Sequence, residues 1–227
     1  MTALPSFDPR LVPVVGIDSH LPKVPVQSMQ PAALAQRFVN AKPWVPEMHA
    51  EPRFSEREPV HASVLVPLVV RDDQLQVLLT LRTANLSTHS GQIAFPGGKA
   101  DADDTSAIAT ALREAKEEIG LDAQFVEVLG QFPIYTTGSA FMITPVVGLV
   151  HAGFSVQPNP QEVADIFEVP LEFLMNPAHH RRHAVQWAGQ HREWLSMPYT
   201  DTDARTERFI WGATAGILRN FYRFLLD

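Results

Sequence analysis

Three glutamates within five residues are the part of this sequence best suited to do chemistry. Glu114, Glu117 and Glu118 lie in the segment REAKEEIGL, which begins at Arg113. At about 100° per residue in a helix, Glu114 and Glu118 stand side by side and Glu117 neighbours Glu114. Carboxylates this close destabilise a helix unless a cation neutralises them. Mg²⁺ takes one or two protein carboxylates and adds water and substrate phosphates, so the cluster favours a divalent-cation site.

The residues around the glutamates predict the helix that must carry them. Asp104–Ser106 offers N-cap chemistry before the helix, and Gly120 stands where a C-cap glycine belongs. Gly97 and Gly98 precede it and let a loop backbone pack closely and aim a carbonyl at a metal. A solvated, charged helix face is the competing interpretation of REAKEE alone, and the two glycines favour the metal site. The apolar stripe at helical spacing consists of Ile108, Leu112, Ala115 and Ile119.

The composition fits one domain with an extension. The chain has 227 residues, of which 45% are hydrophobic and 19% charged, enough for a buried core. It has no cysteine, which excludes disulfides, thiolate metal sites and cysteine nucleophiles. The net charge of -7 argues against a nucleic-acid partner. No apolar run approaches a membrane span and the start lacks a signal-peptide pattern, so we expect no membrane partner and a cytoplasmic location.

The order of predicted elements indicates an α+β fold. We expect residues 1–59 to form a Pro-rich N-terminal extension with a helix at 31–39, and residues 60–227 to form the domain. Pro67 indicates an edge strand or a bulge. Strands before and after a central helix, and a closing helix at 207–226, predict a helix/sheet/helix sandwich with a mixed sheet. The strands are expected at 62–70, 74–81, 124–132 and 141–150, with two more within 182–198; 161–167 is ambiguous and 170–175 is a helical turn.

The glycine turn and the helix together resemble the Nudix hydrolase family. The family box runs Gly, five residues, Glu, seven residues, Arg-Glu, an aliphatic, any residue, Glu-Glu, any residue, Gly, an aliphatic. Its second half is present at residues 113–121, with Ala115 at the first aliphatic position. In the first half, Gly98 and Asp104 each lie one residue before the expected place, which we interpret as a shifted loop with Asp104 as the acid. The resemblance implies the Nudix-type α/β/α sandwich.

A narrower resemblance is to the Nudix coenzyme A pyrophosphatases. Two positions depart from their signature: Thr83 replaces Ser or Ala, and Ser87 replaces an arginine. Arginine binds phosphate in a bidentate manner, so Ser87 would lose a contact that Arg82, His89 or Lys99 could replace. The matching positions are Leu78, Leu79, Thr80, Arg82, Gly91, 95–98, 145–148 and 210–215.

These resemblances imply hydrolysis of the diphosphate of coenzyme A or its derivatives to 3′,5′-ADP and 4′-phosphopantetheine. Arg113 would orient the glutamates, and either a helix glutamate such as Glu117 or the loop residue Glu162 would be the general base. A solvated turn residue is the competing interpretation of Glu162. The implied ligands of Mg²⁺ or Mn²⁺ are Glu114, Glu118, Glu117 and the Gly98 carbonyl, and the implied substrate contacts are Arg82, Gly97, Lys99 and His89.

Two other functions stay open at this point. A Nudix pyrophosphohydrolase of nucleoside triphosphates or nucleotide sugars would keep the metal site and change the pocket, and Ser87 favours it. A non-catalytic Nudix-fold binding module should have lost box carboxylates, and all three helix glutamates are present. A homodimer is expected from the resemblance and the long extension. A zinc site at the clustered histidines, such as His180 and His183, is disfavoured because they lack closed-site spacing.

Overall fold

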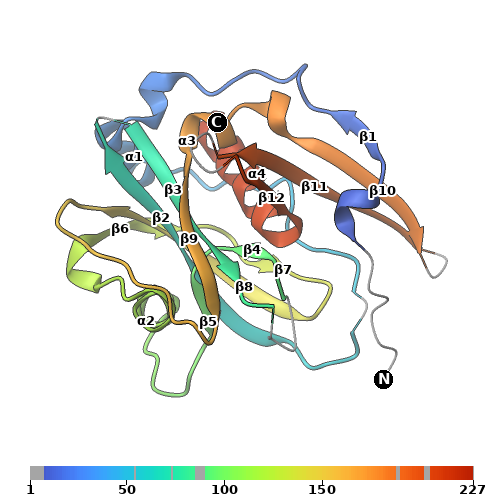
Figure 1. Ribbon diagram of the computed structural model, residues 1–227. Coiled ribbons are helices and arrows are strands. Elements are labelled where there is room, and N and C mark those ends of the chain that lie inside the picture. Colours follow the sequence, from blue (N-terminus) through green and yellow to red (C-terminus); the bar gives the residue numbers. More distant parts are fainter. Residues whose placement is uncertain are drawn as a thin grey trace.

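The computed structural model of the protein describes residues 8–53, 55–72, 74–84, 90–187, 190–201 and 205–226. Figure 1 shows the arrangement of the elements. The helices are α1 (Pro31–Val39), α2 (Ala107–Ile119), α3 (Leu171–Leu174) and α4 (Gly212–Leu226), with short 3₁₀ helices η1 (Pro9–Leu11), η2 (Val26–Met29), η3 (Ala123–Phe125) and η4 (Pro177–His179). The strands are β1 (Val14–Ile17), β2 (Val60–Arg71), β3 (Gln74–Arg82), β4 (Ile93–Ala94), β5 (Gly97–Lys99), β6 (Val126–Gln131), β7 (Tyr135–Thr136), β8 (Phe141–Val150), β9 (Val163–Pro170), β10 (Arg181–Trp187), β11 (Gln190–Thr200) and β12 (Glu207–Trp211).

The central sheet is mixed, as predicted. Its main order is β4-β3-β2-β8-β6, and β5, β7 and β9 pair with β2, β8 and β3 respectively. Strands β2 and β8 run parallel, whereas β2 and β3 form an antiparallel hairpin. The long strand β2 therefore places β5, which carries the two glycines, at one end of the same sheet that holds β3.

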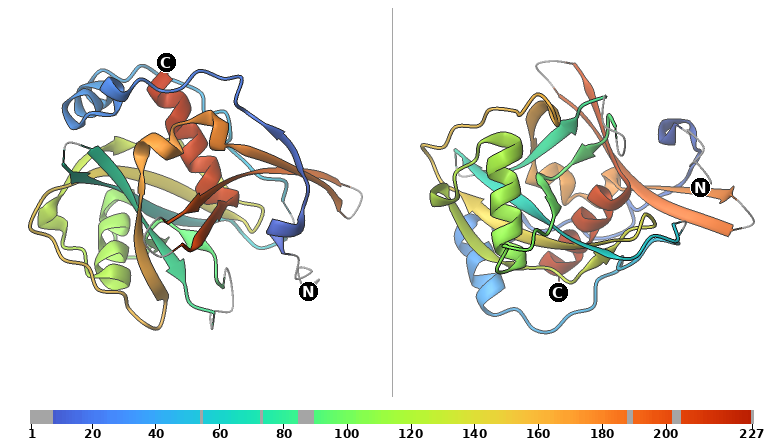
Figure 2. Two further views of the ribbon diagram at one scale, coloured as in Figure 1. Left: turned by 45° about the horizontal axis from the view of Figure 1, so that its top comes forward. Right: turned by 90° about the horizontal axis from the view of Figure 1, so that it is seen from below.

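Helices cover both faces of this sheet, which confirms the predicted sandwich (Figure 2). On one face, Ala111, Ala115 and Ile119 of α2 pack in one core with Leu65 and Val69 of β2. The neighbouring β2 residues point to the opposite face because side chains alternate along a strand. That second core gathers Val66 and Leu68 of β2 with apolar residues of α1 and α4, among them Leu34, Ile217, Leu218 and Phe221.

Pro67 lies in the middle of the sheet, so the predicted edge strand or bulge is wrong. At this residue β2 is paired with β8, opposite Gly148. The other edge of β2 pairs with β5 through residues 62–64 and with β3 from Leu68 onward. Pro67 thus falls where β2 changes partner, a place where its missing N–H interrupts neither of these two ladders.

A second, antiparallel sheet has the order β1-β10-β11-β12. It includes the two strands expected within 182–198. The predicted helix at 207–226 is wrong over its first five residues, because Glu207–Trp211 pair with β11 as strand β12. Gly212 has a φ of 60°, a left-handed conformation that turns the chain from β12 into α4.

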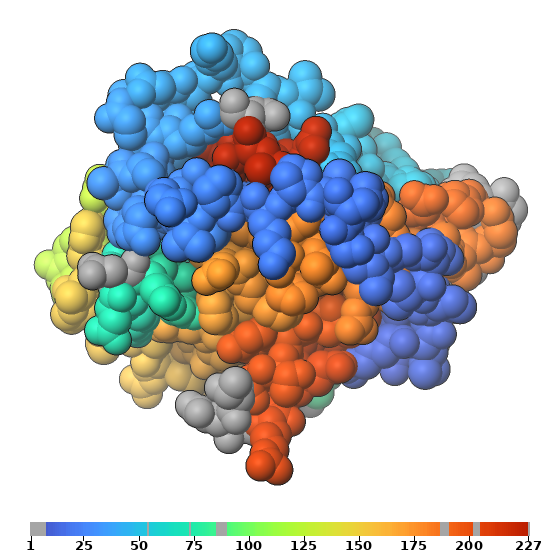
Figure 3. Space-filling view, turned by 90° about the horizontal axis from the view of Figure 1, so that it is seen from above, coloured from blue at the N-terminus to red at the C-terminus, as the bar shows by residue number. Residues whose placement is uncertain are grey.

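The N-terminal part of the chain lies across the domain, where the blue segment crosses the surface beside the red C-terminal helix (Figure 3). Leu34 of α1 is fully buried, and the Phe38 ring stacks on Phe132 at a centroid distance of 5.7 Å. Strand β1 pairs with β10. The division at residue 59, the homodimer and the cellular location stay predictions. Within the described residues, none of the helices combines the length and apolar character needed to cross a membrane.

Candidate active site

The local sequence builds α2 as predicted. The Ser106 hydroxyl accepts a hydrogen bond from the Ala109 N–H at 3.1 Å and so caps the first turn. Gly120 ends the helix in the left-handed conformation with a φ of 69°. The apolar stripe of α2 faces the sheet. Glu114 and Glu118 lie beside this stripe, on the side of the helix that contacts β5.

Glu118 is the buried centre of the site. Its side chain is only 2% exposed. One carboxylate oxygen accepts a hydrogen bond from the Gly97 N–H at 3.0 Å, and the other accepts one from Arg82 Nη1 at 3.1 Å. Burial raises the pKa of Glu118 to about 7, although Gly97 and Arg82 favour the ionised form. A carboxylate held away from water in this way is suited to contact a cation.

Gly98 brings the backbone of β5 against the second glutamate. A Cβ atom at this position would lie 2.5 Å from the Glu114 carboxylate atoms, so only glycine leaves room for them. Burial raises the pKa of Glu114, and a hydrogen bond from Arg113 partly offsets this. The partly desolvated carboxylates of Glu114 and Glu118 therefore lie against the backbone of the two glycines of β5, which have no side chains.

Arg113 links the predicted acid of the loop to the helix glutamates. Its Nε and Nη2 atoms donate to the two oxygens of Asp104 at 3.0 and 2.9 Å. Its Nη1 atom donates to Glu114 at 2.9 Å and to Glu117 at 3.1 Å. The Asp104 pKa is driven well below its ordinary value, mainly by the Arg113 hydrogen bonds. Asp104 thus anchors the arginine that fixes the position of Glu114.

The structure also brings Glu162 to this site from far along the sequence. The Asn159 N–H donates to the Glu118 carbonyl at 2.8 Å and the Glu162 N–H donates to the Asn159 carbonyl at 3.0 Å, so the loop that carries Glu162 is held against the end of α2. The negative charge of Glu162 contributes to raising the pKa of both Glu114 and Glu118. The Thr83 N–H donates to the Glu162 carbonyl at 2.9 Å, which holds the loop before β9 beside the end of β3. Glu117, by contrast, is 57% exposed.

Of the remaining predicted substrate contacts, Gly97 and Lys99 lie beside α2 and His89 lies outside the described residues. The Lys99 carbonyl accepts a hydrogen bond from Arg113 at 3.0 Å, and Lys99 as a whole is exposed to solvent. Gly97 faces Glu118 through its N–H. His89 and Ser87 fall in 85–89, outside the described residues.

The donor set fits a hydrated ion better than a closed protein cage. Across the described part of the chain, no group of three or more His, Cys, Asp or Glu residues is arranged to hold a metal. Mg²⁺ needs only one or two carboxylates when water and phosphates complete its shell. The half-buried Glu114 and the buried Glu118 beside the Gly98 backbone supply that number. His180 and His183, considered for zinc, are buried and hydrogen-bonded to protein groups.

Comparison with known proteins decides the family. The family model described as NUDIX domain matches residues 59–195. A protein named uncharacterized Nudix hydrolase NudL from Photorhabdus laumondii subsp. laumondii is 43% identical over 159 residues, or 70% of this chain and 81% of the relative. A protein of the same name from Yersinia enterocolitica is 43% identical over 160 residues, or 70% of this chain and 78% of the relative. The chain belongs to the Nudix hydrolase family.

Two solved structures also resemble this Nudix hydrolase at low identity. One is a C. elegans Ap4A hydrolase binary complex, 20% identical with a TM-score of 0.44, covering 52% of this chain and 85% of that chain. The other is the NUDIX domain of Shewanella oneidensis NrtR complexed with ADP ribose, 22% identical with a TM-score of 0.42, covering 52% of this chain and 79% of that chain.

Family membership confirms the predicted Nudix fold and the predicted pyrophosphatase. The protein is a hydrolase of diphosphate-containing substrates, and Nudix hydrolases need a divalent metal ion. Sequence reasoning did not find the Arg82–Glu118 ion pair or the Arg113–Asp104 pair. The first depends on the position of β3 in the sheet, which no local pattern predicts. The second had a signal, since Asp104 and Arg113 flank the N-terminal turns of α2.

Proposed function

We propose that this Nudix hydrolase cleaves the diphosphate of coenzyme A or a derivative, giving 3′,5′-ADP and 4′-phosphopantetheine. The observation that carries the proposal is the 3.1 Å contact between Arg82 and Glu118. Arg82 is the charged residue of the signature that resembles the coenzyme A pyrophosphatases, and Glu118 belongs to the Nudix box. Residues of the coenzyme A pyrophosphatase signature and of the Nudix box are therefore in contact. This is the arrangement expected if both sets of residues act on one substrate.

Other signature residues support that site from behind. Leu78 and Leu79 are buried in the two cores. The Thr80 hydroxyl donates to the Ala94 carbonyl at 3.1 Å and ties β3 to β4, which leads into the glycine turn. Thr83, at a position that departs from the signature, donates through its hydroxyl to the Gln161 carbonyl at 3.2 Å. This bond fixes the loop that carries Glu162.

The proposed roles follow from the positions of the charged groups. Glu114, Glu118 and the Gly98 carbonyl would hold Mg²⁺ or Mn²⁺, with Glu117 as an outer ligand. Such an ion, when bound, lowers the pKa of a water molecule and offsets charge on the phosphates. Arg113 orients Glu114 through their 2.9 Å hydrogen bond.

Glu162 is the stronger of the two predicted general bases. It is half-buried on a loop that is hydrogen-bonded to the Glu118 backbone, whereas Glu117 is largely exposed and paired with Arg113. A base in that position is close to the place where an activated water would form. Lys99 and Arg82 would contact the substrate phosphates, with His89 as a further predicted contact.

A product assay with coenzyme A and Mg²⁺ or Mn²⁺ tests the proposal. The parent should release 3′,5′-ADP, Glu118→Gln should lose nearly all of this activity, and the exposed Glu172→Gln should keep it. Cleavage of nucleoside triphosphates or nucleotide sugars, with coenzyme A left intact, would instead support the second candidate, which the serine at position 87 favours. In that case the metal site stands and the proposed substrate is wrong.

A further inference from the structure

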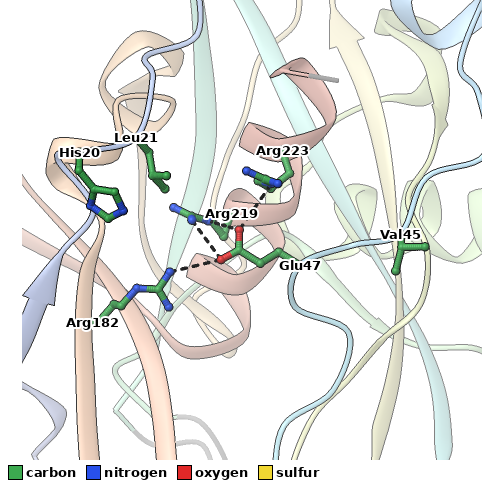
Figure 4. A pocket seen from close by; sticks show the side chains of 7 residues that line it. All are labelled: His20, Leu21, Val45, Glu47, Arg182, Arg219 and Arg223. Carbon is green, nitrogen blue, oxygen red and sulfur yellow. Dashed lines mark hydrogen bonds and ion pairs between the residues drawn. The ribbon is translucent and has the colours of Figure 1, made fainter.

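A charged cavity lies away from the candidate active site. It has a volume of about 370 Å³ and is lined by His20, Leu21, Val45, Glu47, Arg182, Arg219 and Arg223. The N-terminal segment, β10 and α4 supply these residues, and none comes from β3, β5 or α2. Figure 4 shows three arginine side chains directed toward the single Glu47 carboxylate.

Arg219 is the structural member of the three arginines. Its guanidinium is 2% exposed and donates to the two oxygens of Glu47 at 2.7 and 3.0 Å. Its remaining nitrogen lies 3.0 Å from His180 Nδ1 and 3.0 Å from Asp18 Oδ2. Arg219 therefore fixes Glu47 and Asp18 of the N-terminal segment onto α4 and forms the floor of the cavity.

Arg182 and Arg223 keep donors at the mouth of the cavity. Their side chains are 39% and 40% exposed. Arg182 donates through Nε to Asp18 at 2.7 Å and through Nη2 to Glu47 at 3.3 Å. For Arg223 the described residues provide one ion pair, to Glu47 at 3.7 Å. A guanidinium has five N–H donors in a planar fork, so both arginines still have donors for a ligand.

The charges of the cavity do not cancel. Three arginines face two carboxylates, Asp18 and Glu47, which leaves one positive charge. The whole chain, by contrast, has a net charge of -7. A concentrated positive charge in a concave site of an acidic protein attracts anions. Arg182 and Arg223 are the exposed arginines of the cluster, so an incoming group can reach them.

We propose that this cavity binds a phosphoryl group, donated either by inorganic phosphate or by a phosphate monoester. The forks of Arg182 and Arg223 match the oxygens of a tetrahedral phosphate, and bidentate arginine–phosphate contacts are among the strong charge-assisted hydrogen bonds. The volume of about 370 Å³ falls within the range of small-molecule sites, so a monoester has room for its organic part. The Met48 N–H and carbonyl are both hydrogen-bonded to the Asn220 side chain, at 2.9 and 2.6 Å, so the backbone next to Glu47 is anchored to α4.

Titration calorimetry with inorganic phosphate tests the site, with a chelator present to keep divalent ions away from the Nudix helix. Arg223→Gln and Arg182→Gln should each weaken binding about tenfold, the loss expected for one charge-assisted contact. Arg181→Gln on the same strand removes the same charge from an exposed residue outside the cavity and should bind as the parent does. Thermal unfolding of each variant checks that it is folded.

The other outcomes distinguish the ligand sources from an incorrect proposal. Tighter binding of glycerol 3-phosphate than of phosphate would identify a monoester site, and equal binding would identify a site for free phosphate. Absence of phosphate binding to the parent, or equal binding by all the arginine variants, would overturn the proposal. The arginines would then have only the structural role of holding the N-terminal segment on α4. Loss of binding in Glu118→Gln but not in Arg223→Gln would place the phosphate in the active site and overturn it too.

Discussion

Arg82 of β3 and Glu118 of α2 form an ion pair of 3.1 Å across 36 residues of sequence. Glu118 is almost fully buried, so this arginine and the Gly97 N–H are the groups that compensate its charge. Arg82 Nε is itself buried without a hydrogen-bond partner among the described residues. Arg82, which has one buried nitrogen without a hydrogen-bond partner, is thus paired with a carboxylate that a metal ion would also contact.

Replacing this arginine should make stability depend on metal. Arg82→Gln leaves the Glu118 charge poorly compensated, so the metal-free protein should lose about 1–3 kcal/mol of unfolding free energy. Saturating Mg²⁺ should restore much of that loss, because a cation then faces the carboxylate. Urea unfolding with and without Mg²⁺ measures this. Arg71→Gln breaks an exposed pair with Glu168 and should cost less than about 1 kcal/mol, with no response to Mg²⁺. An equal loss in Arg82→Gln with and without the ion would contradict the prediction.

Glu118→Gln should separate catalysis from folding. We expect kcat/KM to fall by at least about 10²-fold, because the variant loses a carboxylate ligand of the ion that would activate the attacking water. The parent Glu118 has a folded pKa of about 7 against 4.5 for the unfolded state, so metal-free stability from this group falls as the pH rises from 4.5 through 7. The variant should lack that decline, which amounts to about 3 kcal/mol at most. Parallel pH dependences in parent and variant would refute the account of this carboxylate.

The two neighbouring glycines should respond differently to alanine. In Gly98→Ala the new methyl meets the flexible Glu114 carboxylate, so the carboxylate moves, activity falls and stability changes little. In Gly97→Ala the methyl would lie 2.4 Å from the Ser63 carbonyl oxygen, a backbone atom that cannot move without distorting β2. Gly97→Ala should therefore be destabilised by more than Gly98→Ala. Kinetic assays and thermal unfolding of both variants check this, and equal effects on stability would count against it.

The sequence predicts what depends on neighbours in the chain and misses what depends on distant strands. The caps of α2 at Ser106 and Gly120 are local, so the helix and its glutamates were predictable. Apolar residues also recur at helical spacing from Phe209 to Leu225, near the end of the chain. The residues up to Trp211 nevertheless pair with β11, and the helix starts only at Gly212. In the site, Arg82 and Glu162 reach α2 only because β3, β5 and β9 meet in one sheet. The spacing of residues in the sequence does not predict that these three strands belong to one sheet.

The N-terminal segment should contribute directly to stability. Leu34→Ala empties a fully buried position of α1 in the core shared with α4, so we expect a loss of about 2–5 kcal/mol. Val39→Ala on the same helix removes an exposed side chain and should change the unfolding free energy by less than about 0.5 kcal/mol. Denaturant unfolding of the two variants gives the comparison. A small effect of Leu34→Ala would mean that this segment is not part of the cooperative fold.

Buried His180 should make the protein sensitive to acid. Its Nε2 atom is hydrogen-bonded to the Leu174 carbonyl at 2.7 Å, and its Nδ1 atom accepts from Arg219 at 3.0 Å, an arrangement that requires a neutral ring. Burial, together with the charge of Arg219, lowers the pKa of His180 from 6.5 to about 4. Below pH 6.5 the unfolded chain takes up a proton that the folded protein refuses, so stability is lost as the pH falls from 6.5 toward 4, by about 3 kcal/mol at most.

His180→Gln removes this titration and tests its contribution. The unfolding free energy of the variant should decline less than that of the parent between pH 6.5 and 4, because the unfolded variant has no such proton to bind. At pH 8 the ring is neutral in both states of the parent, so the difference measured there isolates the lost hydrogen bonds and serves as the reference. If the difference between parent and variant stays constant from pH 8 to pH 4, His180 is not the acid-sensitive group, and the link between the buried ring and Arg219 has no part in the acid response.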